Sequence, residues 1–176
     1  MPDEVSIDKF HTVPALKGLS AAELDVVDSI TFTVALKPGQ TLFKEGDAGD
    51  GMYLLVNGDI ELSKKIDTDA RWQVARLEPG ACFGEMALLG NQPRAATCNA
   101  LTTALLLKIP YKEFNALLKA GNMAVLKVTA NLARVLSSRL TKLLADQSRL
   151  LKAQRALSTD TQQRLITLYK RNEGLV

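Results

Sequence analysis

Histidine and cysteine are scarce in this sequence of 176 residues, which contains one histidine and two cysteines. His11 has no second histidine or cysteine near it, and Cys82 and Cys98 are too few and too widely spaced for a metal knuckle. We therefore expect no metal site, and we interpret both cysteines as reduced, buried apolar side chains.

Long apolar runs are missing as well, and no stretch approaches the roughly 18 residues that a membrane-spanning helix requires. The chain starts with the acidic sequence Met-Pro-Asp-Glu instead of the basic start of a signal peptide. The sequence also lacks a recognisable pair of nucleophile and base. These absences predict a cytoplasmic protein with no membrane partner, no catalytic residues and no enzymatic activity.

Acidic residues become rare after residue 122. Residues 1–122 carry 12 basic and 16 acidic side chains, whereas residues 123–176 carry 10 basic and 3 acidic ones. A basic excess can bind nucleic acid, but the 19 residues that follow Leu157 are too few for a helix-turn-helix unit. We therefore interpret the excess as a solvated helix face and keep nucleic-acid binding only as an alternative.

Closely spaced strands are predicted to follow one short N-terminal helix. Ser20 is a good N-cap residue and Glu23 completes a capping box, which predicts a helix to about Ser29. Asn57-Gly58 lies between two apolar runs and predicts a tight hairpin. The predicted fold is mainly β with helical flanks, an antiparallel β-roll or jelly-roll-like barrel that closes on itself to hide its edges. Strands are expected near residues 31–35, 52–56, 59–66, 72–77 and 104–109.

The chain is predicted to be helical after Pro110. We expect a short helix over residues 111–118, a break at Gly121-Asn122, and one long helix over residues 123–157, which contain neither glycine nor proline. Ser158 is expected to cap a last short helix over residues 159–171. These boundaries divide the chain into a β-roll domain, residues 1–122, and a helical part for a lid and dimerisation, residues 123–176.

Two apolar stripes run along the predicted long helix. The first alternates in steps of four and three residues, which is typical of a coiled-coil seam and predicts a homodimer. The alternative is that this seam packs on the protein's own roll. The second stripe is expected to lie against the roll. The seam consists of Thr129, Ala133, Leu136, Leu140, Leu143, Gln147, Leu150, Gln154 and Leu157, and the second stripe of Val125, Val128, Leu132 and Val135.

Two segments rich in small residues are candidates for phosphate binding. Gly46, Gly49 and Gly51 lack the lysine and the spacing of a nucleoside-triphosphate loop, so we interpret them as turn residues. Residues 83–97 combine a glycine at a strand end, an expected helical turn, and an arginine followed by two alanines. Backbone N–H groups at such a turn bind phosphate, and the Arg94 guanidinium can pair two phosphate oxygens at once.

The segment Phe83-Gly84-Glu85-Met86-Ala87-Leu88-Leu89-Gly90-Asn91-Gln92-Pro93-Arg94-Ala95-Ala96-Thr97 resembles the phosphate-binding cassette of the cyclic-nucleotide-binding domain family. Protein kinase A regulatory subunits, catabolite-activator regulators and cyclic-nucleotide-gated channels carry this domain. The resemblance spans roughly residues 16–118. It implies that Glu85 accepts the ribose 2′-hydroxyl of a 3′,5′-cyclic nucleotide and that Arg94 neutralises the cyclic phosphate. Further ligand contacts are expected from Phe83, Gly84, Met86, Ala87, Ala95, Ala96 and Thr97.

The resemblance also bears on the base and on signalling. cGMP-selective members of the family tend to carry Thr or Ser directly after the arginine, where this chain has Ala95, so cAMP is the expected ligand and cGMP is less favoured. Alignment with the long helix of the family places Ser138 and Arg139 near the base. Binding is expected to act through this helix on an unknown effector protein.

The sequence therefore predicts a non-enzymatic cAMP sensor or regulatory module. One alternative is a structural or interaction module whose pocket stays empty. A second is a nucleic-acid-associated protein that uses the basic C-terminal helices, and a third is a regulatory piece of a larger complex or a channel-like assembly.

Overall fold

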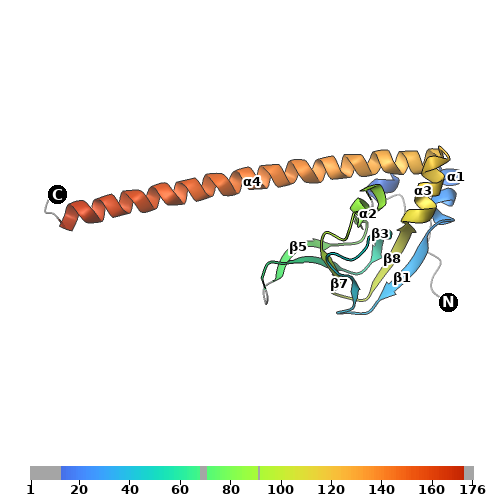
Figure 1. Cartoon of the computed structure of the whole chain (residues 1–176), viewed down its shortest axis with the longest axis horizontal. Helices are drawn as coiled ribbons and strands as arrows, with labels where there is room; N and C mark the ends of the chain where they lie inside the picture. The colour runs from blue at the N-terminus through green and yellow to red at the C-terminus, as the bar shows by residue number, and fades with distance from the viewer. Residues whose placement is uncertain (1–12, 68–70, 91, 173–176) are drawn as a thin grey trace. The chain divides into compact units, whose positions relative to one another are not determined.

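The computed structural model of this protein describes residues 13–67, 71–90 and 92–172, so His11 lies outside the described residues. The chain forms two compact units, the first ending at Val135 and the second beginning at Leu136. Figure 1 shows the strands and short helices of the first unit, together with the long helix α4, which contributes to both units.

The described strands form two four-stranded sheets in which every pairing is antiparallel. One sheet has the order β1-β8-β3-β6 and the other the order β2-β7-β4-β5. The predicted β-roll is confirmed, although β2, β6 and β7 are absent from the sequence prediction because they are too short to show an alternating pattern. The strands are β1 Phe32–Leu36, β2 Thr41–Phe43, β3 Gly51–Asn57, β4 Ile60–Lys65, β5 Arg71–Leu77, β6 Cys82–Phe83, β7 Thr97–Ala100 and β8 Ala104–Pro110.

Helices precede and follow the strands in the sequence, and α2 lies between β6 and β7. Ser20 caps α1 with the predicted capping box, because its hydroxyl accepts from the Glu23 N–H while the Glu23 carboxylate accepts from the Ser20 N–H. Among the described residues, no helix combines the length and the apolarity needed to cross a membrane. The helices are a 3₁₀ turn η2 Pro14–Leu16, α1 Ala21–Asp28, α2 Glu85–Gly90, α3 Tyr111–Lys119 and α4 Met123–Asn172.

The predicted break at Ser158 is wrong, since α4 continues without interruption to Asn172. Two threonine hydroxyls that follow Ser158 are accommodated inside the helix. The Thr159 hydroxyl donates to the carbonyl of Arg155 at 3.0 Å, and the Thr161 hydroxyl donates to that of Leu157 at 2.9 Å. Such bonds to the preceding turn satisfy a Ser or Thr side chain without ending the helix.

Two apolar clusters stabilise the first unit. One fills the space between the two sheets, and the other joins η2, α1, α3 and the start of α4 to β3 and β8. The second stripe of α4 belongs to the latter cluster, with Val125, Val128 and Leu132 fully buried and Val135 partly buried. The first compact unit thus includes the first turns of α4, beyond residue 122, where we predicted a domain boundary.

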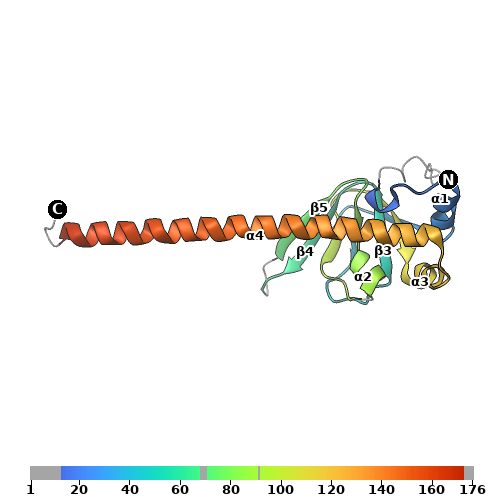
Figure 2. The same cartoon turned by 90° about the horizontal axis from the view of Figure 1, so that it is seen from above.

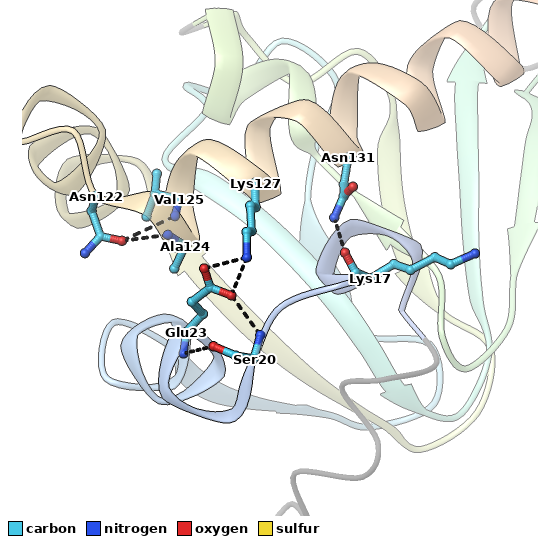
Figure 3. A network of polar contacts seen from close by, with 8 residues as sticks. All are labelled: Lys17, Ser20, Glu23, Asn122, Ala124, Val125, Lys127 and Asn131. Atoms are coloured by element: carbon cyan, nitrogen blue, oxygen red, sulfur yellow. Dashed lines mark hydrogen bonds and ion pairs between the residues drawn. The ribbon is translucent and has the colours of Figure 1, made fainter.

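Polar contacts also attach the start of α4 to the N-terminal elements (Figure 3). Asn122 caps α4, because its Oδ1 accepts from two backbone N–H groups of the first turn at 3.0 and 3.4 Å. Lys127 Nζ lies 2.7 Å from the carboxylate of Glu23. One turn later, Asn131 Nδ2 donates to the carbonyl oxygen of Lys17 at 2.8 Å. The start of α4 therefore has a defined place on the roll.

Candidate functional site

Arg94 is a buried cation whose guanidinium is only partly paired. The residue is 4% exposed. Its Nη1 donates to the carbonyl oxygen of Gly51 at 2.7 Å, and its Nη2 donates to Asp50 Oδ1 at 2.7 Å. The Nε–H is buried and has no hydrogen-bond partner in the structure. An unsatisfied donor on a buried charge is costly, so the arrangement is suited to an anion that would accept this bond.

Aromatic rings enclose the guanidinium. Arg94 Cζ lies 4.3 Å from the ring centroid of Phe43 and 5.4 Å from that of Tyr53. Tyr53 in turn stacks on Phe83 with centroids 5.5 Å apart. Cation–π contacts of this kind stabilise a desolvated guanidinium and restrict its orientation. The rings come from β2, β3 and β6, so both sheets contribute to the position of one side chain.

Asp50 serves two cations at once. It pairs with Arg94 and also with Lys108 of β8, whose ammonium contacts Asp50 Oδ2. Burial acts to raise the pKa of Asp50, but Lys108 and Arg94 together outweigh it and hold that pKa below its ordinary value. Asp50 is therefore ionised at neutral pH, and this ion pair is lost only as the pH falls through the depressed pKa.

Because Gly84 has no side chain, the guanidinium of Arg94 can lie close to its backbone. This residue has φ +75°, and a Cβ there would lie 2.6 Å from Arg94 Nη1. The backbone of Arg94 also pairs with the β2–β3 loop, since its N–H donates to the Asp47 carbonyl at 2.8 Å and its carbonyl accepts from the Gly46 N–H at 2.9 Å. The two segments considered for phosphate binding therefore lie against each other.

The other predicted residues of the cassette occupy different environments. Phe83 in β6, Glu85 and Ala87 in α2, and Thr97 in β7 are buried, and the Thr97 hydroxyl accepts from the Glu45 N–H at 3.1 Å. Met86 and Ala95 are exposed, and Ala96 is half-buried. The cassette therefore has both buried and exposed members, and their contact with a ligand stays a prediction.

Ser138 and Arg139 belong to the second compact unit, within α4. Ser138 is exposed and Arg139 is half-buried. Their contact with the base stays a prediction.

Sequence reasoning missed the residues that surround Arg94. Asp50, Phe43, Tyr53 and Lys108 lie on other strands or loops, and the bond from Arg94 to Asp50 joins residues 44 positions apart. No local pattern signals such a pairing. Gly49 and Gly51, which we interpreted as turn residues, have little space beside them. A Cβ at Gly49 would collide with Ala87 of α2, and a Cβ at Gly51 with the carbonyl oxygen of Ile109.

Metal binding finds no support in the part of the chain that the structure describes, where no group of three or more His, Cys, Asp or Glu side chains could hold an ion. Both cysteines are buried, and burial raises the pKa of the Cys98 thiol to about 12. Cys98 is therefore protonated at physiological pH and has the expected character of a core side chain.

A model of the family described as "Cyclic nucleotide-binding domain" matches residues 33–120. The chain is 41% identical over 91 residues to the cAMP-dependent protein kinase regulatory subunit of Yarrowia lipolytica. The matched segment covers 51% of this chain and 23% of that protein. It is 33% identical over 125 residues to the cGMP-dependent protein kinase of Toxoplasma gondii, covering 71% of this chain and 11% of that protein. This chain thus spans less than a quarter of the length of either relative.

Among solved structures, the Catabolite Activator Protein of Thermus thermophilus is similar, with a TM-score of 0.70 and 29% sequence identity. The similarity covers 78% of this chain and 62% of that one.

Proposed function

The chain belongs to the cyclic nucleotide-binding domain family, and on that premise we propose that it binds cAMP as a non-enzymatic regulatory module. The observation that carries the proposal is the buried Arg94 guanidinium, whose Nε–H has no partner. A cyclic phosphate oxygen would satisfy this donor and neutralise the charge. Glu85, buried at the start of α2, is the acceptor proposed for the ribose 2′-hydroxyl.

The charges around Arg94 favour a monoanionic ligand. Arg94 and Lys108 share the single carboxylate of Asp50, so these three groups carry one net positive charge. A cyclic phosphate brings one negative charge and would balance the charge of these three groups. Gly84 keeps the backbone close to the guanidinium, and the small side chains of Ala95 and Ala96 would leave room for the sugar phosphate.

The choice of cAMP rests on Ala95, which has no hydroxyl to offer to a guanine. The names of the two kinase relatives refer to cAMP in one case and to cGMP in the other, so they do not decide the base. A direct comparison of the two nucleotides is therefore part of the test below.

A second copy of the chain is the partner proposed for the seam on α4. Leu140, Leu143, Leu150 and Leu157 are each more than half exposed in the single chain. Successive leucines of this set are three or seven residues apart, which is the spacing of a coiled-coil seam. In a parallel, in-register dimer, Gln147 and Gln154 would each face their own copies and could pair amide to amide, whereas a shifted register would bury an amide against leucine.

The proposed output is a change at α4 that an effector protein recognises. Support comes from the core contacts of Val125, Val128 and Leu132, which join the start of this helix to the roll. A change in the roll on ligand binding would therefore reach α4. A cytoplasmic location and the absence of catalysis are part of the same proposal.

Thermal unfolding with and without cyclic nucleotide tests ligand binding. A ligand at 100 times its dissociation constant adds about 2.7 kcal/mol to the free energy of unfolding, so cAMP should raise the Tm of the wild type. Arg94→Ala should weaken binding by about 2–5 kcal/mol, because the phosphate would be desolvated without its charge partner. The ligand-induced shift should then disappear.

The matched control is Arg76→Ala, which removes an arginine from an exposed pair with Asp59. This variant should keep the wild-type shift. Parallel titrations with cGMP should give a smaller shift than cAMP. Equal shifts in the wild type and Arg94→Ala would remove Arg94 from the site.

A further inference from the structure

A hollow of about 510 Å³ lies at the end of the β4–β5 hairpin. β4 pairs with β7 only as far as Ser63, but it pairs with β5 as far as Lys65, so the hairpin continues past β7. Figure 2 shows β4 and β5 side by side. The described residues that line the hollow are Glu45, Lys65, Ile66, Asp67, Arg71 and Thr97.

This hollow lies on the opposite face of β7 from Arg94. Cys98 is buried in the cluster between the sheets, where burial raises the pKa of its thiol and the nearby Arg94 charge opposes that rise. Thr97 precedes Cys98 in β7, so its side chain projects to the other face of the strand. The Thr97 hydroxyl accepts from the Glu45 N–H at 3.1 Å, and both residues line the hollow. The hollow is therefore separate from the site around Arg94.

Ser63 adjoins two of the lining residues and has an unsatisfied hydroxyl. It pairs with Thr97 in the β4–β7 register and precedes Lys65 by two positions, so its side chain is on the same face as theirs. The residue is 3% exposed, and its Oγ has no hydrogen-bond partner among the described residues. A buried hydroxyl without a partner is costly, so a ligand oxygen that accepts from it would be favoured.

Cations outnumber carboxylates around the hollow. The Glu45 carboxylate is already engaged, since it accepts from the Lys65 N–H at 3.2 Å and lies 3.3 Å from Lys64 Nζ. The Lys65 ammonium and the Arg71 guanidinium take part in none of the ion pairs formed between described residues. With Asp67, the second acid of the lining, these side chains carry three positive and two negative charges. One net positive charge remains, which a single carboxylate would balance.

We propose that this hollow binds a small organic carboxylate. Lys65 and Arg71 are directly opposite each other in the β4–β5 register, so their side chains start about 5 Å apart on one face. A carboxylate between them would pair with the ammonium and with the forked N–H groups of the guanidinium, and would accept from the Ser63 hydroxyl.

The size of the hollow and one apolar side chain favour an organic molecule over a bare ion. The volume of about 510 Å³ falls within the roughly 300–1,000 Å³ of small-molecule sites. Ile66 is 67% exposed and offers an apolar wall for the carbon skeleton. The single net positive charge favours a monocarboxylate over a doubly charged phosphate ester. Binding here goes beyond the proposed function and does not depend on it.

Heteronuclear NMR on the full chain tests the proposal, with benzoate as the carboxylate and benzamide as a neutral molecule of similar shape. Benzoate should shift the amide resonances of Lys65 and Ile66 in a saturable way, and benzamide should bind at least tenfold more weakly. Arg71→Gln should weaken benzoate binding about tenfold, because a charge-assisted pair is lost. The matched control is Arg76→Gln on the same strand, whose arginine pairs with Asp59, and it should bind as the wild type does.

Ser63→Ala separates a ligand contact from a structural role. The variant should fold, since it removes a buried hydroxyl that has no partner, and thermal unfolding verifies this. It should bind benzoate about threefold or more weakly than the wild type. Unchanged affinity in both Ser63→Ala and Arg71→Gln would overturn the proposal, as would equal binding of benzoate and benzamide.

Arg94→Ala shows which of the two sites the carboxylate occupies. This variant should bind benzoate with the affinity of the wild type, because Arg94 lies on the other face of β7. Loss of the benzoate shifts in Arg94→Ala would mean that benzoate binds at Arg94, and would refute the second site. A wild type that binds benzoate but no cyclic nucleotide would refute the proposed function and leave this site standing.

Discussion

At the scale of single residues, the chemistry of this protein centres on a charge that is buried without full compensation. Arg94 has one carboxylate, one carbonyl and two aromatic rings around it, and its Nε–H has no partner. A purely structural arginine would be expected to satisfy its donors, because an unmet buried donor costs about 1–3 kcal/mol. The incomplete pairing therefore fits a site in which the last partner is a ligand.

Gly84→Ala and Gly39→Ala form a matched pair of substitutions. Both glycines have positive φ, +75° and +79°, so alanine should cost each variant about 1–2 kcal/mol of stability. Only at Gly84 would the new methyl group collide with Arg94, since a Cβ at Gly39 meets nothing within 4 Å. Calorimetry should therefore show cAMP binding weakened about tenfold or more in Gly84→Ala and unchanged in Gly39→Ala. Equal affinities would mean that Gly84 does not position the guanidinium.

At the scale of elements, α4 changes its environment along its length. Its first turns are packed in the core and held by Asn122, Lys127 and Asn131. By contrast, four leucines of the seam are exposed in the single chain, namely Leu140, Leu143, Leu150 and Leu157. Asn122 also explains where the helix begins, because its side chain caps the first N–H groups after the Gly121 turn. The start of α4 thus stabilises the roll, whereas the part after Leu136 has an exposed apolar face.

Leu132→Ala and Leu140→Ala should separate these two parts. Leu132 is fully buried in the first unit, so its truncation should lower the free energy of unfolding of the roll by about 2–5 kcal/mol. Leu140 is 58% exposed, and its truncation should change the stability of the roll by less than about 0.5 kcal/mol. Urea unfolding followed by Trp72 emission, at one fixed protein concentration, measures both. Comparable losses would mean that Leu140, like Leu132, contributes to the stability of the roll.

At the scale of the whole molecule, charge and apolar surface are divided between the two parts of the chain. The acidic excess lies before residue 123 and the basic excess after it. The exposed leucines of α4 lie in the basic part, where a second copy could cover them while the charged side chains stay in water. Dimerisation through α4 would bring two cyclic-nucleotide domains into one molecule.

Analytical ultracentrifugation tests the dimer with two lysine substitutions. The wild type should sediment at twice the chain mass of 19.1 kDa. Leu143→Lys places a charge in the seam and should give monomers at the same concentration, because a buried, unpaired ammonium opposes association. Ala145→Lys adds the same charge two residues away, outside the seam, and should leave the dimer intact. A monomeric wild type would exclude this role for α4.

The elements that the sequence predicts best are those built from local contacts. The capping box at Ser20 and the long helix follow from hydrogen bonds and side-chain spacings within a few residues. The hairpin predicted at Asn57-Gly58 is wrong, because β3 pairs with β6 and β8 whereas β4 pairs with β5 and β7, so this turn carries the chain from one sheet to the other. The two-residue strand β6 and the bulge at Val74 could not be predicted, because both depend on the partner strand. Ser158 misled the prediction because the same hydroxyl suits a cap or a helix interior.

By itself, the sequence determined the family resemblance, the cassette with Glu85 and Arg94, and the apolar seam of α4, since each is written in contiguous or regularly spaced residues. Only the tertiary structure decided that Asp50, Lys108, Phe43 and Tyr53 surround Arg94. The physical reason is that these groups meet through sheet register and burial, and both arise only when distant strands pair.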